Sequence, residues 1–333
     1  MELPYITADL PGTGGALRRT DDDFEVEEIP AYTPCGEGDH VYAWIEKRDL
    51  STPRAVELTA AALGVGARDV GAAGMKDRHA VTRQWLSFPP PVAPEAVRGL
   101  AVDGLRVLDV ARHGNKLRTG HLRGNRFRLC VRNAEPGCAE RARAILARLA
   151  EPPGSPNWYG EQRFGARGDN ADAGRALLRG ERLPGRPPRG RQKRLLISAY
   201  QSHLFNEYLR RRIEQGLYAE VLDGEVMRGG VPGGPMFGHK LHLPPPDTAA
   251  GRLERAVLDA AGVALADFAR GGKLAAGTRR AIAVDVGAAA VEPVDDRTFW
   301  VSFDLPAGGY ATAVMRELVK PPYPSREPSP ETS

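Results

Sequence analysis

Residues 125–132 read NRFRLCVR, and they carry the clearest β-strand signal in the chain. Phe127, Leu129 and Val131 alternate with arginines, so an extended backbone places apolar side chains on one face and basic ones on the other. The stretch therefore predicts a strand with one face on a core and a strongly basic second face.

Other segments around this strand also have clear periodicity. Residues 41–47 and 299–305 predict strands, and residues 138–149 and 195–216 predict helices. A further helix is expected in STPRAVELTAAALG, with Thr52 as its N-cap and Pro53 as its first residue. The order of elements indicates an α+β or α/β protein, and the pattern alone does not choose between them.

The domain organisation follows from a break at residues 151–157, EPPGSPN. A more helical region follows the break, and a strand and helix return near the end. We expect a discontinuous domain made of residues 1–155 and 290–333, interrupted by an insertion domain at 157–285. The Pro/Ser-rich tail from about residue 321 is expected to be disordered.

Composition limits the class of protein. The 333 residues are 42% apolar and 26% charged, without a run of eighteen apolar residues or a recognisable secretory signal, so a cytoplasmic globular protein is expected. Three cysteines without C-x-x-C spacing argue against a zinc ribbon. Residues 179–194 carry seven arginines and lysines against one glutamate, which suits either a phosphate backbone or a flexible basic linker.

A second stretch, GMKDRHAVTRQW at residues 74–85, surrounds one carboxylate with cations and a histidine. Its simplest interpretation is a solvated charge run. An Asp/His hydrolase using Asp77 and His79 is an alternative, but no convincing nucleophile or oxyanion motif supports it.

This stretch occurs in order with DDDFEVEEIP (21–30), HLRGNRFRLCVR (121–132), NWYGEQRFG (157–165), ISAYQSHLFNEYL (197–209) and FDLPAGGYATAVMREL (303–318). Together the motifs resemble the TruD family of tRNA pseudouridine synthases, from about Gly12 to Leu318. The pattern G-x-K-D-x-x-A-x-T-x-Q is long and peculiar to that family.

The resemblance implies that Asp77 is the catalytic residue. Its carboxylate would attack C1′ of the target nucleotide or remove the C2′ proton. A basic residue before the DF segment serves in the family as its ion-pair partner, which implies Arg18, with Arg19 one register step away. Lys76 and His79 are nearer in sequence but rank below Arg18 for this pairing, and Lys76 is retained as a substrate-binding candidate.

The resemblance also implies that Phe127 stacks on the uracil and that Asn125 is its polar companion near the base or the carboxylate. The alternation by itself favours Phe127 as a core residue, and the resemblance reverses that preference. Residues of GEQRFG and QSHLFN are expected to build the domain junction and to pack and cap the long helix.

The expected fold is thus α+β: a pseudouridine-synthase domain with a mixed, mostly antiparallel sheet and an inserted domain, arranged as a V. The expected substrate is uridine 13 in the D-stem of a tRNA, tRNA-Glu, flipped out of its stack. No metal, organic cofactor or obligate protein partner is expected, and the chain would be a monomer. The alternative is a catalytically idle RNA-binding protein or RNA chaperone on the same fold.

Overall fold

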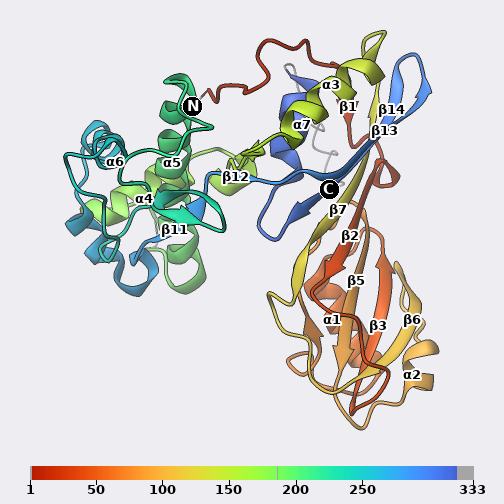
Figure 1. Ribbon diagram of the computed structural model, residues 1–333. Coiled ribbons are helices and arrows are strands. Elements are labelled where there is room, and N and C mark those ends of the chain that lie inside the picture. Colours follow the sequence, from red (N-terminus) through yellow and green to blue (C-terminus); the bar gives the residue numbers. More distant parts are fainter. Residues whose placement is uncertain (1, 186, 321–333) are drawn as a thin grey trace. The chain divides into compact units, whose positions relative to one another are not determined.

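The structure is a computed structural model and describes residues 2–185 and 187–320 (Figure 1). The expected disordered tail lies outside the described residues. The chain forms two compact units. One contains residues 148–285 together with 2–9 and 312–317, and the other contains residues 10–147, 286–311 and 318–320. The predicted insertion at 157–285 lies within the first unit, and the division falls inside two helices, α3 (Cys138–Ala150) and α7 (Ala311–Val319).

The second unit is built on a nine-stranded sheet with the order β13-β14-β7-β2-β5-β3-β6, in which β1 also pairs with β7 and β4 with β5. Strands β2 and β5 run parallel, and the other recorded pairs are antiparallel. The strands are β1 (Ala16–Leu17), β2 (Phe24–Pro30), β3 (His40–Lys47), β4 (Gly71–Ala72), β5 (Val81–Phe88), β6 (Leu105–His113), β7 (Leu122–Arg132), β13 (Gly287–Asp295) and β14 (Thr298–Pro306). This unit is α+β with a mostly antiparallel sheet.

Helices α1 (Thr52–Ala62) and α2 (Pro94–Arg98) cover one face of this sheet (Figure 1). The buried side chains Val41, Ala43 and Ile45 of β3 form one apolar cluster with Ala60 of α1 and Val97 of α2. A short 3₁₀ helix, η1 (Asp21–Asp23), precedes β2.

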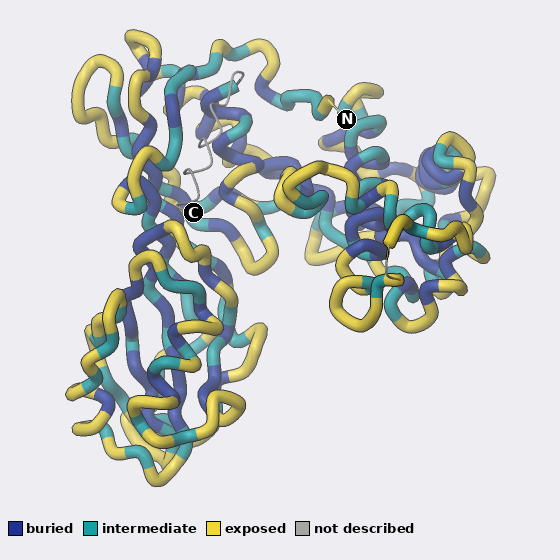
Figure 2. The backbone as a smooth tube through the Cα atoms, turned by 180° about the vertical axis from the view of Figure 1, so that it is seen from behind, coloured by how far each residue is buried: buried dark blue, intermediate teal, exposed yellow. Residues whose placement is uncertain are grey.

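The first unit is mainly helical around α5 (Gly190–Glu214), whose aromatic side chains lie in its core. Its other elements are β8 (Ser155–Pro156), η2 (Glu161–Phe164), α4 (Asn170–Arg179), β9 (Met227–Arg228), β10 (Val231–Met236), α6 (Ala249–Ala261), η3 (Leu265–Ala275), β11 (Thr278–Ala281) and β12 (Ala283–Val284). Buried segments run through the centres of the elements, and exposed ones lie in the loops (Figure 2). Among the described residues, no helix is long and apolar enough to cross a membrane.

The predicted strands 41–47, 125–132 and 299–305 and the predicted helix 138–149 are confirmed. The predicted N-cap Thr52 is wrong. Ser51 is the N-cap, because its side chain accepts a hydrogen bond from the Arg54 N–H, while Thr52 is buried and bonded elsewhere.

Candidate active site

One row of side chains crosses five neighbouring strands on the face of the sheet that α1 covers. Register places Phe303 beside Phe127, Phe127 beside Val26, Val26 beside Thr82, and Thr82 beside Lys47. Side chains of directly paired residues point to the same face of a sheet. The aromatic ring expected to stack on uracil and a buried cation therefore lie on one face, three strands apart.

The loop carrying Asp77 connects β4 to β5 and is held by a buried hydroxyl and a buried amide. The Thr52 hydroxyl accepts a hydrogen bond of 2.9 Å from the Lys76 N–H and donates one of 2.9 Å to Gln84 Oε1. Gln84 Nε2 donates in turn to the Gly74 carbonyl at 3.2 Å. Because Thr52 and Gln84 are almost completely buried, these bonds fix the loop backbone.

Lys76 forms a buried ion pair beneath the same loop. Its ammonium lies 2.9 Å from Glu28 Oε2, and both side chains are at most 2% exposed. Burial raises the pKa of Glu28, although the Lys76 charge and a hydrogen bond from the Trp85 N–H oppose the rise. Lys76, predicted as a substrate-binding residue, is placed as the partner of Glu28 at the base of the loop.

The cation recorded next to Asp77 is Lys47, the last residue of β3. Its ammonium donates a hydrogen bond of 2.8 Å to the Asp77 carbonyl oxygen, and the Lys47 residue is 0% exposed. Burial lowers the pKa of Lys47 to about 8, while the Asp77 carboxylate favours the charged form and the Lys76 charge disfavours it. Asp77 itself is exposed.

An aromatic layer lies on the β2 and β7 side of this face. Phe127 is 7% exposed, and its ring is nearly parallel to that of Phe24, with centroids 6.3 Å apart. Phe303 lies 5.8 Å from Phe127 on the other side. The guanidinium carbon of Arg18 lies 4.0 Å from the centroid of the Phe24 ring. The structure thus groups Arg18 with the aromatic layer, and its predicted pairing with Asp77 stays a prediction.

Asn125 has a buried acceptor without a protein partner. No described residue donates to its Oδ1, and the residue lies between Glu28 and Leu305 in the register. A buried unpaired carbonyl oxygen is unfavourable unless water or a ligand donates to it.

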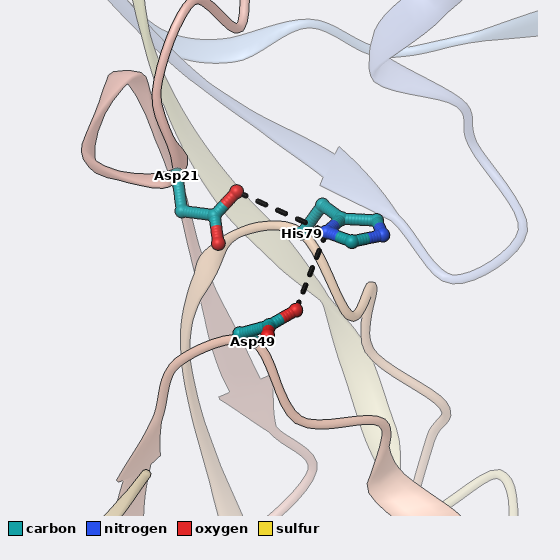
Figure 3. A group of neighbouring side chains, drawn as sticks. All are labelled: Asp21, Asp49 and His79. Carbon is teal, nitrogen blue, oxygen red and sulfur yellow. Dashed lines mark ion pairs between the residues drawn. The ribbon is translucent and has the colours of Figure 1, made fainter. Parts of the chain in front are cut away.

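A cluster of Asp21, Asp49 and His79 lies where His79, two residues after Asp77, approaches η1 and the residues after β3; Asp49 and His79 are exposed and Asp21 is partly buried (Figure 3). The His79 Nδ1 atom is 3.4 Å from Asp49 Oδ1 and 4.0 Å from Asp21 Oδ1. Arg78 Nε lies 3.0 Å from the same Asp49 oxygen. Asp49 therefore already lies opposite the Arg78 guanidinium, and His79 faces these aspartates, which removes support for an Asp77–His79 dyad.

The basic face of β7 is neutralised by carboxylates of neighbouring strands. The pairs are Arg126 with Asp304, Arg128 with Glu25 and Glu292, and Arg132 with Asp23. The predicted basic face of this strand is present, but the sequence pattern did not reveal which carboxylates pair with its arginines. This face is an ion-pair network.

In the first unit, the motif residues have structural contacts. The Asn206 side chain bonds both the N–H and the carbonyl of Tyr159, and Gln201 donates to the Phe237 carbonyl. Arg163 Nε donates to the Ser202 hydroxyl at 3.1 Å. The predicted packing role of the QSHLFN residues is consistent with these contacts.

Sequence reasoning gave no role to Glu28, Lys47 or Gln84, and it assigned Thr52 to the N-cap of α1 and not to the site. Gln84 is the last residue of the G-x-K-D-x-x-A-x-T-x-Q pattern, so the motif itself could have marked it as a site residue. A signal for Lys47 was its place at the end of the predicted strand 41–47, whereas Glu28 lay in a motif for which no strand was predicted.

Comparisons with known proteins identify the family of this chain. A family model described as tRNA pseudouridine synthase D (TruD) matches residues 1–183 and 227–318. A tRNA pseudouridine synthase D of Anaeromyxobacter dehalogenans (strain 2CP-C) is 51% identical over 347 residues, covering 96% of this chain and 97% of that protein. One from Thermus thermophilus is 38% identical over 339 residues, covering 95% of this chain and 92% of its own length.

The fold has a counterpart among solved structures. A crystal structure of a candidate tRNA pseudouridine synthase D (TruD) from Methanosarcina mazei superposes with a TM-score of 0.76 at 23% identity, covering 96% of this chain and 99% of that one. With the family model and the relatives, the conclusion is direct: this chain belongs to the TruD family of tRNA pseudouridine synthases, isomerases that act on tRNA.

Proposed function

We propose that the chain converts uridine 13 in the D-stem of tRNA, specifically tRNA-Glu, to pseudouridine, and that Asp77 is its catalytic residue. The observation that carries the proposal is the setting of Asp77. Its carboxylate is exposed, while its backbone is held by a buried ammonium and its loop by buried hydrogen bonds. A rigid backbone with an accessible carboxylate suits attack on, or proton removal from, a bound nucleotide.

A buried cation lies beside Asp77. The Asp77 carboxylate interacts electrostatically with the Lys47 ammonium and favours the charged form of that lysine. An ionised carboxylate can attack C1′ of the ribose, and it can also take the C2′ proton in a glycal route. Either route breaks the N1–C1′ bond and frees the uracil within the site.

The free uracil must be retained while it turns. Phe127, between Phe24 and Phe303, offers a ring face that holds a flat base without fixing its rotation. The unpaired Asn125 Oδ1 can accept a hydrogen bond from a base N–H in one of its orientations. C1′ then joins C5 in place of N1, and no redox change occurs.

The experiment is tritium release from tRNA labelled at C5 of uridine, because formation of the new bond expels the C5 hydrogen. Wild-type protein is expected to release tritium, and Asp77→Asn to release none. Asp49→Asn is the matched control: Asp49 is another exposed aspartate near this loop, and its loss should leave release unchanged. Release by Asp77→Asn at the wild-type rate would refute the catalytic assignment.

Substrate position is tested separately. Product mapping in tRNA from cells lacking the protein should show uridine at position 13 of tRNA-Glu, restored to pseudouridine by the wild-type gene. Normal pseudouridine at that position in the deletion strain would refute the assigned substrate.

A further inference from the structure

The Asp77 loop presents an apolar side chain to solvent. Met75 is 74% exposed, which is the largest exposure among the exposed large apolar residues that the structure describes. Single exposed apolar residues are common on protein surfaces, so exposure alone is weak evidence. Here the residue lies two positions before the proposed catalytic aspartate.

The backbone on both sides of Met75 is held in place. The Gly74 carbonyl accepts from Gln84 Nε2, and the Lys76 N–H donates to the Thr52 hydroxyl. The Lys76 ammonium is also tied to Glu28. The loop therefore cannot easily turn the Met75 side chain inward, and it offers that side chain from a fixed position.

A second loop lies against this one. The Gly120 N–H donates a hydrogen bond of 2.8 Å to the Ala73 carbonyl, and a Cβ added at Gly74 would lie 3.3 Å from Leu122 Cδ1. The second loop is itself anchored, because the Leu117 N–H donates to the Ser87 hydroxyl at 2.9 Å. The loop of residues 117–123 thus has a defined position against Ala73 and Gly74, which precede Met75 in the chain.

This second loop carries cations without acidic partners. Arg118 and Arg123 are exposed, and neither forms an ion pair with a residue in the described part of the chain. Arg126, three residues after Arg123, is by contrast bonded to Asp304 through two nitrogens. An unpaired guanidinium is available to a phosphate, and phosphate contacts position a protein on a nucleic acid.

We propose that Met75, Arg118 and Arg123 form the surface that binds the RNA on either side of the flipped uridine. This rests on the proposed function, because it requires a paired target nucleotide to leave its stack. Met75 inserts into the gap that the uridine vacates, as apolar side chains do between base steps, and the two arginines bind flanking phosphates. The partner is RNA, since one exposed apolar side chain and two exposed guanidinium groups lie on the loop of Asp77 and the loop packed against it, and Asp77 is the residue proposed to act on ribose.

The insertion of Met75 is tested with an RNA hairpin in which 2-aminopurine stands next to a paired uridine that the wild-type enzyme modifies. Binding is followed in the Asp77→Asn background, so no turnover occurs. Asp77→Asn should raise 2-aminopurine fluorescence, and adding Met75→Leu should preserve the rise. Adding Met75→Ala should abolish most of it. An unchanged fluorescence rise with Met75→Ala would overturn the proposed insertion of Met75.

Turnover gives a second readout. Met75→Ala should lower kcat/KM by about ten-fold or more on the paired hairpin, because unstacking a base requires a few kcal/mol. The same variant should match wild type on an RNA with that uridine in an unpaired loop. Equal losses on both RNAs would indicate a structural defect and overturn the proposal.

The arginines are tested by the salt dependence of hairpin binding. Arg118→Gln and Arg123→Gln should each reduce the slope of log K against log salt by about 0.7–0.9, the value for one phosphate contact. Arg126→Gln is the matched control and should leave the slope unchanged. A reduction of the slope with Arg126→Gln as large as with Arg123→Gln would overturn the assignment of the arginines.

Failure of the proposed function is distinguished by the activity assay. If the wild-type protein released no tritium, the proposed function would be refuted, whereas binding and fluorescence do not depend on turnover.

Discussion

The Lys47 ammonium donates a 2.8 Å hydrogen bond to the Asp77 main-chain carbonyl from a completely buried position. Among the described residues, no carboxylate lies within ion-pair distance of Lys47. A buried ammonium without such a partner is unfavourable for folding. Its hydrogen bond fixes the backbone at Asp77, and its charge interacts with the Asp77 carboxylate.

Replacing this cation should separate activity from stability. Lys47→Met should lower kcat by about ten-fold or more, because a hydrogen bond from a charged donor contributes about 1.5–3 kcal/mol. The free energy of unfolding should stay the same or rise, since an apolar chain replaces a buried charge. Tritium release and urea unfolding provide the two measurements, and a large fall in stability would contradict the prediction.

The other buried lysine should behave in the opposite way. Lys76→Met leaves the Glu28 carboxylate, which is 0% exposed, without its partner. Breaking a buried pair in this way destabilises a protein by about 3–5 kcal/mol. Urea unfolding should show that loss, and Glu28→Gln combined with Lys76→Met should recover part of it. Equal stability of Lys76→Met and Lys47→Met would show that the two environments are not distinct.

The pH dependence follows from Lys47. Its pKa is lowered from 10.5 to about 8 in the folded protein, so the ammonium loses its proton as pH rises through 8. Turnover should fall there. Between those two values only the unfolded chain holds the proton, so the contribution of Lys47 to the free energy of unfolding should rise with pH. The measurements are kcat and urea unfolding below and above pH 8, and the fall in kcat near pH 8 should be absent in Lys47→Met.

If Phe127 stacks on the uracil, activity should require an aromatic ring at this position. Phe127→Leu should keep most of the stability, because a branched apolar side chain still fills the buried position. Its kcat/KM should fall by about 5- to 150-fold, matching about 1–3 kcal/mol for stacking on a base. Phe127→Tyr retains a ring face and should keep more activity than Phe127→Leu. The reverse order would contradict a stacking role.

Thr52 and Ser51 provide a matched pair for testing the loop. Thr52→Val leaves the Lys76 N–H and Gln84 Oε1 without a partner, which should lower stability by about 1–3 kcal/mol and also lower kcat. Ser51→Ala removes the cap of α1 and should lower stability by about 1 kcal/mol. Activity of Ser51→Ala measured well below its melting temperature should match wild type.

Much of the fold could be predicted because the apolar periodicity of a strand or helix can be read within one short segment of sequence. The alternation in 125–132 and the apolar stripe of 138–149 both gave the correct elements. The Pro/Gly-rich region after Met227 gave no such pattern, yet it contains the strand β10. A Cβ at Gly234 would lie 2.8 Å from the Phe205 ring, so glycine there lets the strand pack directly on α5.

The site was predictable only where its residues adjoin in sequence. Asp77 and Phe127 came from local motifs. Phe127 lies in the strand row that ends at Lys47, and the Lys47 ammonium bonds the Asp77 carbonyl, which leaves the roles of Asp77 and Phe127 as predictions. Lys47 lies thirty residues before Asp77, and only strand register and loop path bring the two together. The choice of Thr52 as cap failed because two adjacent hydroxyls compete for that role, and a long-range bond decided between them.

The place of β14 in the sheet has a consequence for synthesis. Phe303 lies beside Phe127 in space, yet its strand follows the whole of residues 148–285 in the chain. A ribosome therefore makes Asp77 and Phe127 long before the second wall of the aromatic layer exists. The growing polypeptide cannot complete its aromatic layer until the ribosome has passed through residues 148–285 and made β14.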